Sequence, residues 1–405
     1  MKKFNKFLSV AVASAMVMAM AGCGNTDNGS AATGTNAATE SAAASDSAAS
    51  GSVFKIGGIG PTTRGAAVYG LAVQHGAEIA VEEINAAGGI NGYQVEFKFQ
   101  DDEADAEKSV NAYNALKDWG AQIIDGSTTS GACIAVTDKT KEDNMFQITP
   151  SGSAVECVQY DNNFRVCFSN PNQGLASAQY IGENGLAEKI AVIYDSSDVY
   201  SSGIYEKFAK EAENQPFEIV AAEAFTADNK TDFSVQLQKA KDAGADMVFL
   251  PIYYQESALI LTQAAAMGYA PKWFSCDGMD GILGGVDNFD VSLTEGVMLL
   301  TPFAADATDD LTQSFVTKYK EKYGDTPNQF AADSYDAIYV IKAAIEKSGV
   351  TPDMSVSDIC DGMKAAMTEI TVDGLTGSGM TWTADGEANK APKAVVIGNG
   401  AYKAM

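Results

Sequence analysis

From residue 53 onward, short apolar segments alternate with longer segments whose apolar residues recur at helical spacing. Residues 53–56 form the first apolar segment, and a helical pattern covers residues 66–86. The next segment alternates apolar and polar residues, as a half-buried strand does. The same alternation continues through helices predicted over 105–119 and 131–143 and strands predicted at 93–99, 123–124 and 145–148. This order predicts an α/β fold with a parallel sheet that helices cover on both faces.

A second series of the same kind begins near Asn170. Its predicted strands are 189–194, 217–224, 245–250 and 272–275, and its predicted helices are 200–213, 232–243 and 255–267. A mostly helical block follows over 309–349, and the final 375–403 stretch, rich in Gly and Thr, predicts strands with tight turns. The pattern therefore indicates two similar βα modules, a helical block and a short β tail.

The first 22 residues have the layout of a secretory signal peptide. Lys2, Lys3 and Lys6 precede an apolar run over 7–21, which is shorter than the ~20 residues that span a bilayer comfortably. The run ends in Met20-Ala21-Gly22-Cys23, which resembles the bacterial lipoprotein lipobox. We therefore expect Cys23 to be lipid-modified and the mature protein to lie outside the cytoplasm on a membrane surface. An ordinary signal peptide with a chance cysteine is the alternative.

Residues 24–52 are almost entirely Ala, Ser, Thr, Gly, Asn and Asp. Such a composition cannot bury enough apolar surface to offset its ordering entropy, which predicts a disordered tether after Cys23. A flexible coil of this length reaches roughly 30 Å. The tether would hold a folded body just above the membrane.

The amino-acid composition excludes several classes of function for the folded part of the chain. The net charge of −26 argues against a nucleic-acid partner, and 46% hydrophobic residues suffice for a large core. No apolar run of about 20 residues follows Met20, so we expect a soluble body. The single histidine, His75, makes a zinc site unlikely, and no cofactor is predicted.

The cysteines other than Cys23 do not predict a disulfide framework. Five is an odd number, and only Cys157 and Cys167, which flank one predicted loop, are candidates for a bridge. The sequence leaves the state of this pair open.

Catalytic motifs are weak or incomplete. Gly58 and Gly60 follow a strand, but Pro61 comes next and the third glycine of a dinucleotide fingerprint is missing. The sequence has no GxSxG motif and no P-loop, and His75 lies on a separate helix from the candidate serines. We therefore do not expect an enzyme.

Several short motifs occur together in one known family. The chain resembles the leucine/isoleucine/valine-binding proteins, the amino-acid branch of the type 1 periplasmic solute-binding proteins, from Val53 to its end. The motifs are Gly60-Pro61-x-Thr63, Gly76-Ala77-Glu78-x-Ala80-Val81-x-x-Ile84-Asn85, Gly88-Gly89-Ile90-Asn91-Gly92, Asp101-Asp102, Ile148-Thr149-Pro150-Ser151 and Trp382-Thr383-x-x-Gly386.

The resemblance implies two doubly wound lobes joined by three crossovers, with a ligand held between them. It places lobe one at 53–170 plus 303–375 and lobe two at 171–302 plus 376–405. It also implies delivery of the ligand to the permease of an ABC importer, and we expect a monomer. A ligand-loaded partner of a separate sensor is a rival hypothesis.

Loops after predicted strands supply the candidate polar ligands. The loop 126–130 opens a helix, whose N-terminus favours a carboxylate, and the resemblance assigns that carboxylate to Ser130. It further assigns Ser151 and Ser153 to the ligand carboxylate and ammonium, and Asp277, where the family usually has Glu, to the ammonium. Simple N-capping or turn formation would explain the same residues without a ligand.

Aromatic and threonine residues complete the candidate site. Tyr69, Tyr200, Tyr253 and Phe330 fall on pocket positions of the family, although each could equally be a core residue. Thr128 and Thr129 replace more apolar residues of branched-chain binders. This difference argues against a strict Leu/Ile/Val preference and admits polar or aromatic amino acids. Another small polar solute, such as an amide, a nucleoside or an aromatic compound, is the alternative ligand.

Overall fold

Two largely parallel sheets account for the alternating pattern of the chain. The computed structural model describes residues 51–405, which belong to one compact unit. The predicted signal peptide, Cys23 and the tether up to residue 50 lie outside the described residues. We call the elements around the first sheet the first lobe and those around the second sheet the second lobe; the lobe boundaries given above stay a prediction.

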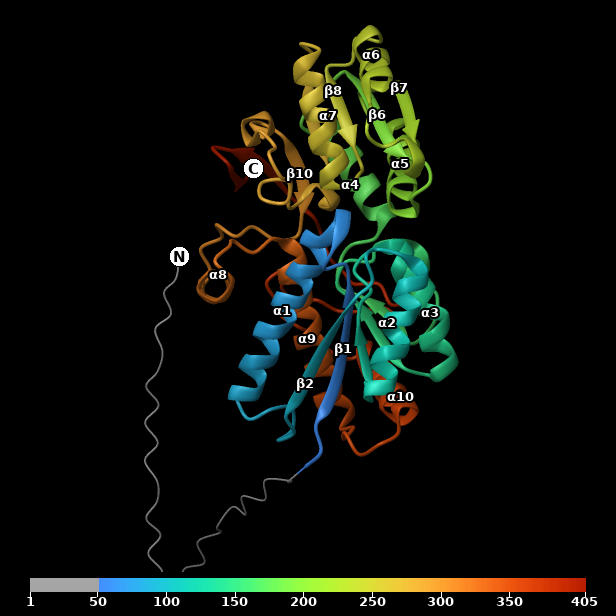
Figure 1. Ribbon diagram of the computed structural model, residues 1–405, viewed down its shortest axis with the longest axis vertical. Helices are drawn as coiled ribbons and strands as arrows, with labels where there is room; N and C mark the ends of the chain where they lie inside the picture. Colours follow the sequence, from blue (N-terminus) through green and yellow to red (C-terminus); the bar gives the residue numbers. More distant parts are fainter. Residues whose placement is uncertain (1–50) are drawn as a thin grey trace, which may run out of the picture. The chain divides into compact units, whose positions relative to one another are not determined.

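The first sheet has five parallel strands in the order β2-β1-β3-β4-β5. The strands are β1 (Phe54–Gly60), β2 (Val95–Asp101), β3 (Ile123–Asp125), β4 (Phe146–Thr149) and β5 (Asn163–Arg165). One face carries α1 (Ala67–Ala86) and α9 (Gln329–Ser348), and the other carries α2 (Ala106–Trp119) and α3 (Ser130–Asp143), as Figure 1 shows. Because β1 neighbours both β2 and β3, ligands are expected beyond the carboxyl ends of these strands.

The second sheet has seven strands in the order β12-β11-β10-β9-β8-β6-β7. Five are parallel: β6 (Lys189–Asp195), β7 (Glu218–Phe225), β8 (Met247–Leu250), β9 (Lys272–Ser275) and β10 (Met298–Thr301). The last two strands, β11 (Lys393–Gly398) and β12 (Ala401–Ala404), add an antiparallel edge. The β tail predicted from Gly and Thr content thus joins this sheet.

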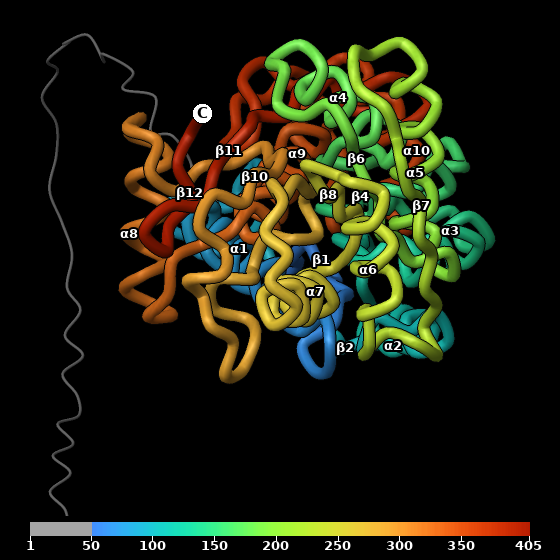
Figure 2. Tube along the Cα trace, turned by 90° about the horizontal axis from the view of Figure 1, so that it is seen from above, coloured from blue at the N-terminus to red at the C-terminus, as the bar shows by residue number. Residues whose placement is uncertain are grey.

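Helices cover both faces of the second sheet, as predicted. Figure 2 shows α4 (Asn170–Glu183) and α5 (Val199–Ala212) on one side of β6 and β8, and α6 (Ser234–Asp242) and α7 (Tyr254–Ala266) on the other. In β6, Ile190 and Val192 pack toward α4 and α5, whereas Ala191 and Ile193 pack toward α6 and α7. The strand is therefore apolar on both faces, which is the pattern of a covered parallel sheet.

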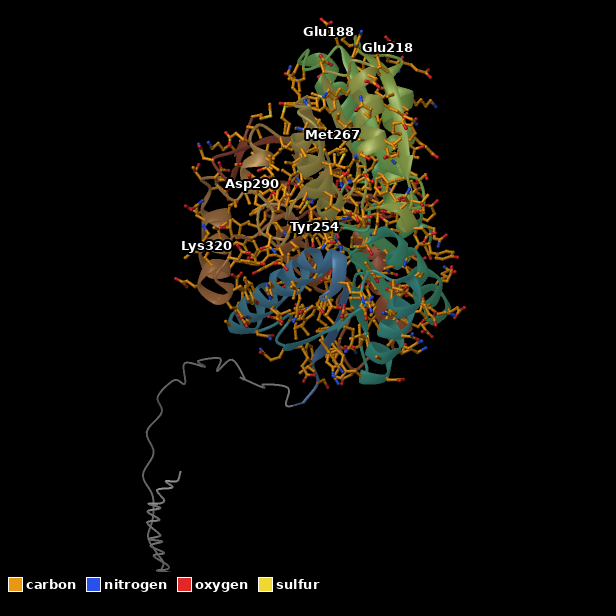
Figure 3. All side chains as sticks on the ribbon, turned by 45° about the horizontal axis from the view of Figure 1, so that its top comes forward. Glu188, Glu218, Tyr254, Met267, Asp290 and Lys320 are labelled. Atoms are coloured by element: carbon orange, nitrogen blue, oxygen red, sulfur yellow. The ribbon has the colours of Figure 1, made fainter. Side chains whose placement is uncertain are left out.

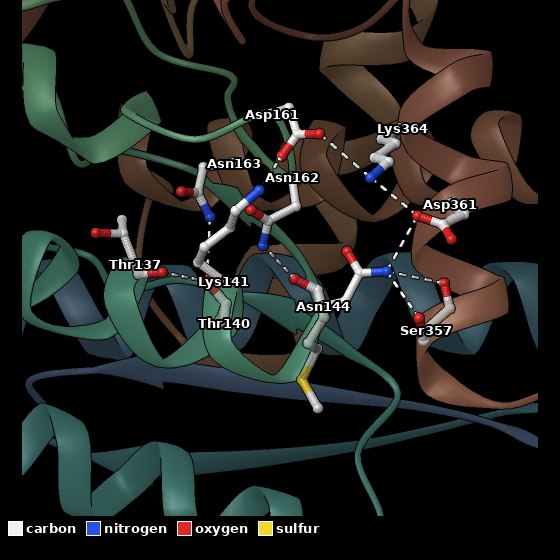
Figure 4. Close-up of polar contacts among 11 residues, drawn as sticks. Thr137, Thr140, Lys141, Asn144, Asp161, Asn162, Asn163, Ser357, Asp361 and Lys364 are labelled. Carbon is white, nitrogen blue, oxygen red and sulfur yellow. Dashed lines mark hydrogen bonds and ion pairs between the residues drawn. The ribbon is translucent and has the colours of Figure 1, made fainter.

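Some elements were not predicted from the sequence. The strands β5, which has one apolar residue between two polar ones, and β10 were missed. The helices α8 (Asp310–Tyr323) and α9 appeared as one helical block. A further helix, α10 (Val356–Met367), is tied by polar contacts to the end of α3 (Figure 4). The Asn144 amide donates to Ser357 Oγ at 2.8 Å and to Asp361 at 3.0 Å, and Lys364 bridges Asp161 and Asp361.

The segment before β11 packs on the first lobe. Trp382 Nε1 donates to the Arg165 carbonyl at 2.8 Å, and the Thr376 hydroxyl donates to Asp336 of α9 at 2.5 Å. The chain begins to pair with the second sheet at Lys393. Among the described residues, no helix combines the length and apolar character needed to cross a membrane.

The contact between α1 and α9 gives the first testable prediction. A methyl group on Gly76 would lie 2.0 Å from the Ala331 carbonyl oxygen, a main-chain atom of α9 that cannot rotate away. We expect Gly76→Ala to lower the free energy of unfolding by about 1–3 kcal/mol, because the two helices must move apart. Urea unfolding followed by circular dichroism measures this change.

Gly131→Ala is the matched control for this experiment. Gly131 lies in the first turn of α3, and a methyl group there would meet no atom within 4 Å. Alanine should stabilise this position by about 0.5–1 kcal/mol, since it restricts the unfolded chain more than glycine does. Equal stabilities for the two variants would contradict the close approach of α1 and α9.

Candidate functional site

A small cavity lies where the carboxyl ends of both sheets meet. Its lining residues are Tyr69, Thr128, Thr129, Ser130, Ser151, Tyr200, Tyr253, Asp277, Gly278 and Phe330. These include every residue predicted for the ligand site except Ser153; Gly278 was not predicted. The space accessible to water centres is about 10 Å³, which is room for about one water molecule. The two lobes therefore contact each other closely around the cavity.

The N-terminus of α3 points its main-chain amides at one side of this cavity. The N-cap residue Thr129 makes no side-chain capping bond, so the amides of the first turn are not satisfied by a cap. Ser130 Oγ accepts hydrogen bonds from the main-chain nitrogens of Ser153 (3.2 Å) and Ala154 (3.1 Å). Ser130 Oγ also lies 3.5 Å from Ser153 Oγ, a long contact that a ligand carboxylate could replace as the acceptor of the Ser130 proton. This end of the cavity suits an anion.

Neighbouring hydroxyl groups are occupied within the protein. Ser151 Oγ donates to the Thr128 carbonyl at 2.6 Å, and Thr128 Oγ1 donates to the Ile59 carbonyl at 3.2 Å. The Thr129 hydroxyl differs, because it is buried and has no hydrogen-bond partner among the described residues. Ser153 is buried behind Ser130, where its main chain supports the Ser130 hydroxyl.

Asp277 provides a buried carboxylate on the opposite, second-lobe wall. Its Oδ1 accepts from the Tyr200 hydroxyl at 2.6 Å, and its Oδ2 accepts from the Gln173 amide at 3.0 Å. Burial raises the pKa of Asp277 to about 7, although the bonds from Tyr200 and Gln173 oppose that shift. Among the described residues it has no ion-pair partner, so the cavity holds a carboxylate that a ligand cation would stabilise.

Four aromatic rings form the remaining walls. Tyr69 and Phe330 of the first lobe have ring centroids 4.3 Å apart, and Tyr200 and Tyr253 of the second lobe stack at 5.0 Å. The centroids of Tyr69 and Tyr253 lie 5.5 Å apart, so the rings of the two lobes meet edge to face. An apolar side chain of a ligand would find a low-polarity wall here.

Direct hydrogen bonds join the lobes beside the cavity. The Tyr69 hydroxyl donates to the Gly278 carbonyl and accepts from the main-chain nitrogen of Tyr254 at 3.2 Å. Figure 3 labels Tyr254 at the end of α7 that meets α1. Gln329 of α9 donates its side-chain amide to the Asp277 carbonyl at 2.9 Å and its main-chain nitrogen to Asp280 at 3.0 Å.

Three of these residues could not be found by sequence reasoning. Gln173, Gln329 and Gly278 act through contacts across long chain separations, for which the sequence gives no local signal. A side chain at position 278 would meet the Tyr200 hydroxyl at 2.6 Å, so glycine is needed for this close approach.

The five cysteines that the structure describes do not form a bridge. Cys133, Cys157, Cys167, Cys276 and Cys360 are all free and buried. Cys157, which the sequence offered as a partner for Cys167, packs instead in a small cluster with Cys133 and Ala154.

Comparisons with known proteins show which family shares this sequence and its two-lobed architecture. A family model described as periplasmic binding protein matches residues 53–401. The chain is 30% identical to Leu/Ile/Val-binding protein homolog 3 of Brucella melitensis, over 74% of this chain and 80% of the relative. It is also 30% identical to the leucine-, isoleucine-, valine-, threonine-, and alanine-binding protein of Pseudomonas aeruginosa, over 73% of this chain and 79% of the relative.

A solved structure shows the same fold. The branched-chain amino acid transporter substrate-binding protein LivJ of Streptococcus pneumoniae, in complex with isoleucine, matches with a TM-score of 0.78 and 28% identity. The match covers 87% of this chain and 98% of the other. The predicted architecture of two doubly wound lobes is thereby confirmed.

The buried carboxyl group of Asp277 gives the second prediction. Its pKa is about 7 in the folded protein and ordinarily 3.8, so the folded state holds this proton more tightly than the unfolded state does. The stability that the proton contributes is complete below pH 4 and is lost as the pH rises through 7. We expect the difference in unfolding free energy between wild type and Asp277→Asn to fall between pH 4 and pH 7.

Urea unfolding at one-unit pH intervals measures this difference. Asp373→Asn is the control, because hydrogen bonds from Ser378 and Gly379 hold the pKa of Asp373 below its ordinary value. Its contribution should instead be lost as the pH falls below 4. A wild-type advantage over Asp277→Asn that grows with pH would show that the carboxylate is favoured in the folded state.

Proposed function

We propose a function from this premise: the chain belongs to the periplasmic binding protein family. Members of this family work outside the cytoplasm and bind solutes without transforming them. We propose that this protein captures an α-amino acid between its two lobes and delivers it to the permease of an ABC importer. It would act as a carrier, not as an enzyme.

One observation supports the amino-acid assignment most directly. The same cavity offers an uncapped helix N-terminus with the Ser130 hydroxyl on one lobe and the buried Asp277 carboxylate on the other. An α-amino acid carries a carboxylate and an ammonium on one carbon, so a single molecule would satisfy both sides. A buried charge is unfavourable unless it is paired, and this makes a zwitterion a better occupant than a neutral solute.

We assign separate roles to the lining residues. Ser130, the first-turn amides of α3 and the main chain of Ser151 would hold the ligand carboxylate, and Asp277 would hold the ammonium. The side chain of the ligand would contact Thr128, Thr129 and the four aromatic rings. Ser153 would act indirectly, by positioning Ser130.

The direct contacts between the lobes suggest how ligand binding changes the conformation that the permease recognises. Tyr69 and Gln329 of the first lobe bond to the second lobe beside the cavity, and these bonds require the lobes to be together. Because the cavity has room for about one water molecule, the loaded form would be closed with the lobes slightly further apart. A ligand that touches both lobes binds such a closed form better than an open form, and therefore shifts the population toward it. The permease would then recognise the closed, loaded carrier.

Finer aspects of the assignment rest on sequence and on relatives. We propose that Cys23 carries a lipid anchor, that the tether keeps a monomeric carrier near its transporter, and that the setting is a Gram-positive type of cell surface. The relatives from Brucella melitensis and Pseudomonas aeruginosa are named as binders of leucine, isoleucine and valine, and the second name adds threonine and alanine. A branched-chain or related amino acid is therefore our proposed ligand, with another small polar solute as the alternative.

The third prediction tests this function by binding. In a thermal-shift screen of the twenty amino acids, several nucleosides and small amides, we expect at least one α-amino acid to stabilise the protein. A ligand at 100 times its dissociation constant should add about 2.7 kcal/mol. Stabilisation by nucleosides or amides alone would overturn the amino-acid assignment.

Two matched variants sharpen this test. Asp277→Asn removes the proposed ammonium partner and should weaken amino-acid binding, whereas Asp125→Asn should not. Asp125 is also a buried carboxyl group with a pKa raised to about 7 by burial, but it does not line the cavity. Wild-type affinity should fall by up to about tenfold per pH unit below pH 7, because the ammonium binds the ionised form of Asp277. Unchanged affinity in Asp277→Asn would show that the ammonium binds elsewhere.

A further inference from the structure

A second and larger cavity adjoins the one that holds Asp277. The space accessible to water centres is about 330 Å³, against about 10 Å³ for the first cavity. Thr129 and Tyr253 line both cavities, so these two residues lie between them. Cavities of small-molecule sites begin at about 300 Å³. A ligand held at Asp277 whose chain passed between Thr129 and Tyr253 would have this space to extend into.

The shared wall carries an unsatisfied polar group. Thr129 is 6% exposed, and its hydroxyl has no hydrogen-bond partner among the described residues. A buried hydroxyl without a partner is unfavourable, and a polar ligand that passes between the cavities would satisfy it. Of the candidate-site threonines, Thr128 cannot serve this purpose because it already donates to the Ile59 carbonyl.

The larger cavity is lined by four carboxylates: Glu103, Asp195, Asp198 and Glu256. Two of them are neutralised by neighbours. Glu256 pairs with Lys230 at 2.9 Å, and Glu103 pairs with Arg64 and with Lys108. Within residues 51–405, Lys230 is the one cationic side chain that lines the cavity, and its ammonium group pairs with Glu256.

Asp195 and Asp198 have no ion pair among the residues that the structure describes. Asp195 Oδ1 accepts from the main-chain nitrogen of Ser197 at 2.8 Å, and Asp198 Oδ1 accepts from that of Tyr200 at 3.1 Å. Burial, together with the charge of Asp195, raises the pKa of Asp198 to about 6, although the bond from the Tyr200 main chain opposes that shift. A cation placed between these two carboxylates would relieve both the burial and the repulsion.

We infer that this second cavity binds the distal cationic group of an amino-acid ligand, such as a side-chain ammonium or guanidinium group, at Asp195 and Asp198. The inference rests on the proposed function, because the α-carboxylate and α-ammonium must occupy the first cavity. Thr129 lies between the two cavities, where such a ligand would pass. This inference narrows the proposed ligand from a branched-chain or related amino acid to a basic one.

The fourth prediction compares L-lysine with L-norleucine, which have the same carbon chain and differ by the terminal ammonium group. Isothermal titration calorimetry at low salt should give at least tenfold tighter binding of L-lysine to the wild-type protein. The double variant Asp195→Asn/Asp198→Asn should lose this preference. Asparagine keeps the N-cap of α5 and the main-chain bonds, so the variant removes charge with little change in shape.

Asp232→Asn/Asp242→Asn is the matched control. It removes two exposed carboxylates from the same lobe, neither of which lines a cavity, and it should keep the wild-type preference for L-lysine. The ratio of the two affinities is the readout, so a general loss of binding in a damaged variant is not mistaken for a loss of selectivity.

The outcomes separate this inference from the proposed function. If L-norleucine binds wild type as tightly as L-lysine, and both need Asp277, the protein is an amino-acid carrier but the second cavity does not select a cation. If the double variant keeps the wild-type affinity ratio, Asp195 and Asp198 are not the recognition site. If no amino acid binds the wild-type protein, the proposed function itself fails.

Discussion

The hydroxyl group of Tyr69 joins the two lobes beside the cavity, and the shape of the cavity depends on this contact. It donates to the Gly278 carbonyl and accepts from the main-chain nitrogen of Tyr254, so one side chain of α1 fixes two separate segments of the second lobe. The same ring packs against Phe330 and Tyr253, which places the aromatic walls at their closest approach. The cavity exists in this form because these contacts hold the carboxyl ends of both sheets together.

That closeness also determines the electrostatics of the cavity. Asp277 is covered by both lobes, and the loss of water raises its pKa to about 7, although Tyr200 and Gln173 donate hydrogen bonds to it. Closing the lobes without a cation therefore carries a desolvation cost, and closing them around an ammonium group removes that cost. This difference in desolvation cost couples ligand binding to closure of the lobes, without a separate switch.

The sequence predicted those parts of the molecule that are encoded by periodic patterns. Strand β9 lies where the pattern put it, and α3 begins one residue before its predicted start. The prediction missed β5, in which Phe164 is the one apolar residue between Asn163 and Arg165, so that its strand character comes from pairing with β4. It also missed β10, although its apolar run resembles those of β8 and β9. The resemblance to the family pointed to most of the residues that line the cavity. It gave no sign that the main chain of Ser153 bonds to Ser130, or that Gln173 and Gln329 bond to Asp277. Those contacts join residues far apart in the chain.

Thr128 and Thr129 show that a polar residue in a site does not always offer a polar group to a ligand. By the resemblance, both stand where branched-chain binders have more apolar residues, and from the sequence both therefore argued for a polar ligand. In the structure Thr128 donates its hydroxyl proton to the Ile59 carbonyl, so that group is committed within the first lobe. Thr129 keeps its hydroxyl uncommitted where the two cavities meet. The case for a ligand other than a simple branched-chain amino acid therefore depends on Thr129 and on the charge of the cavity beyond it.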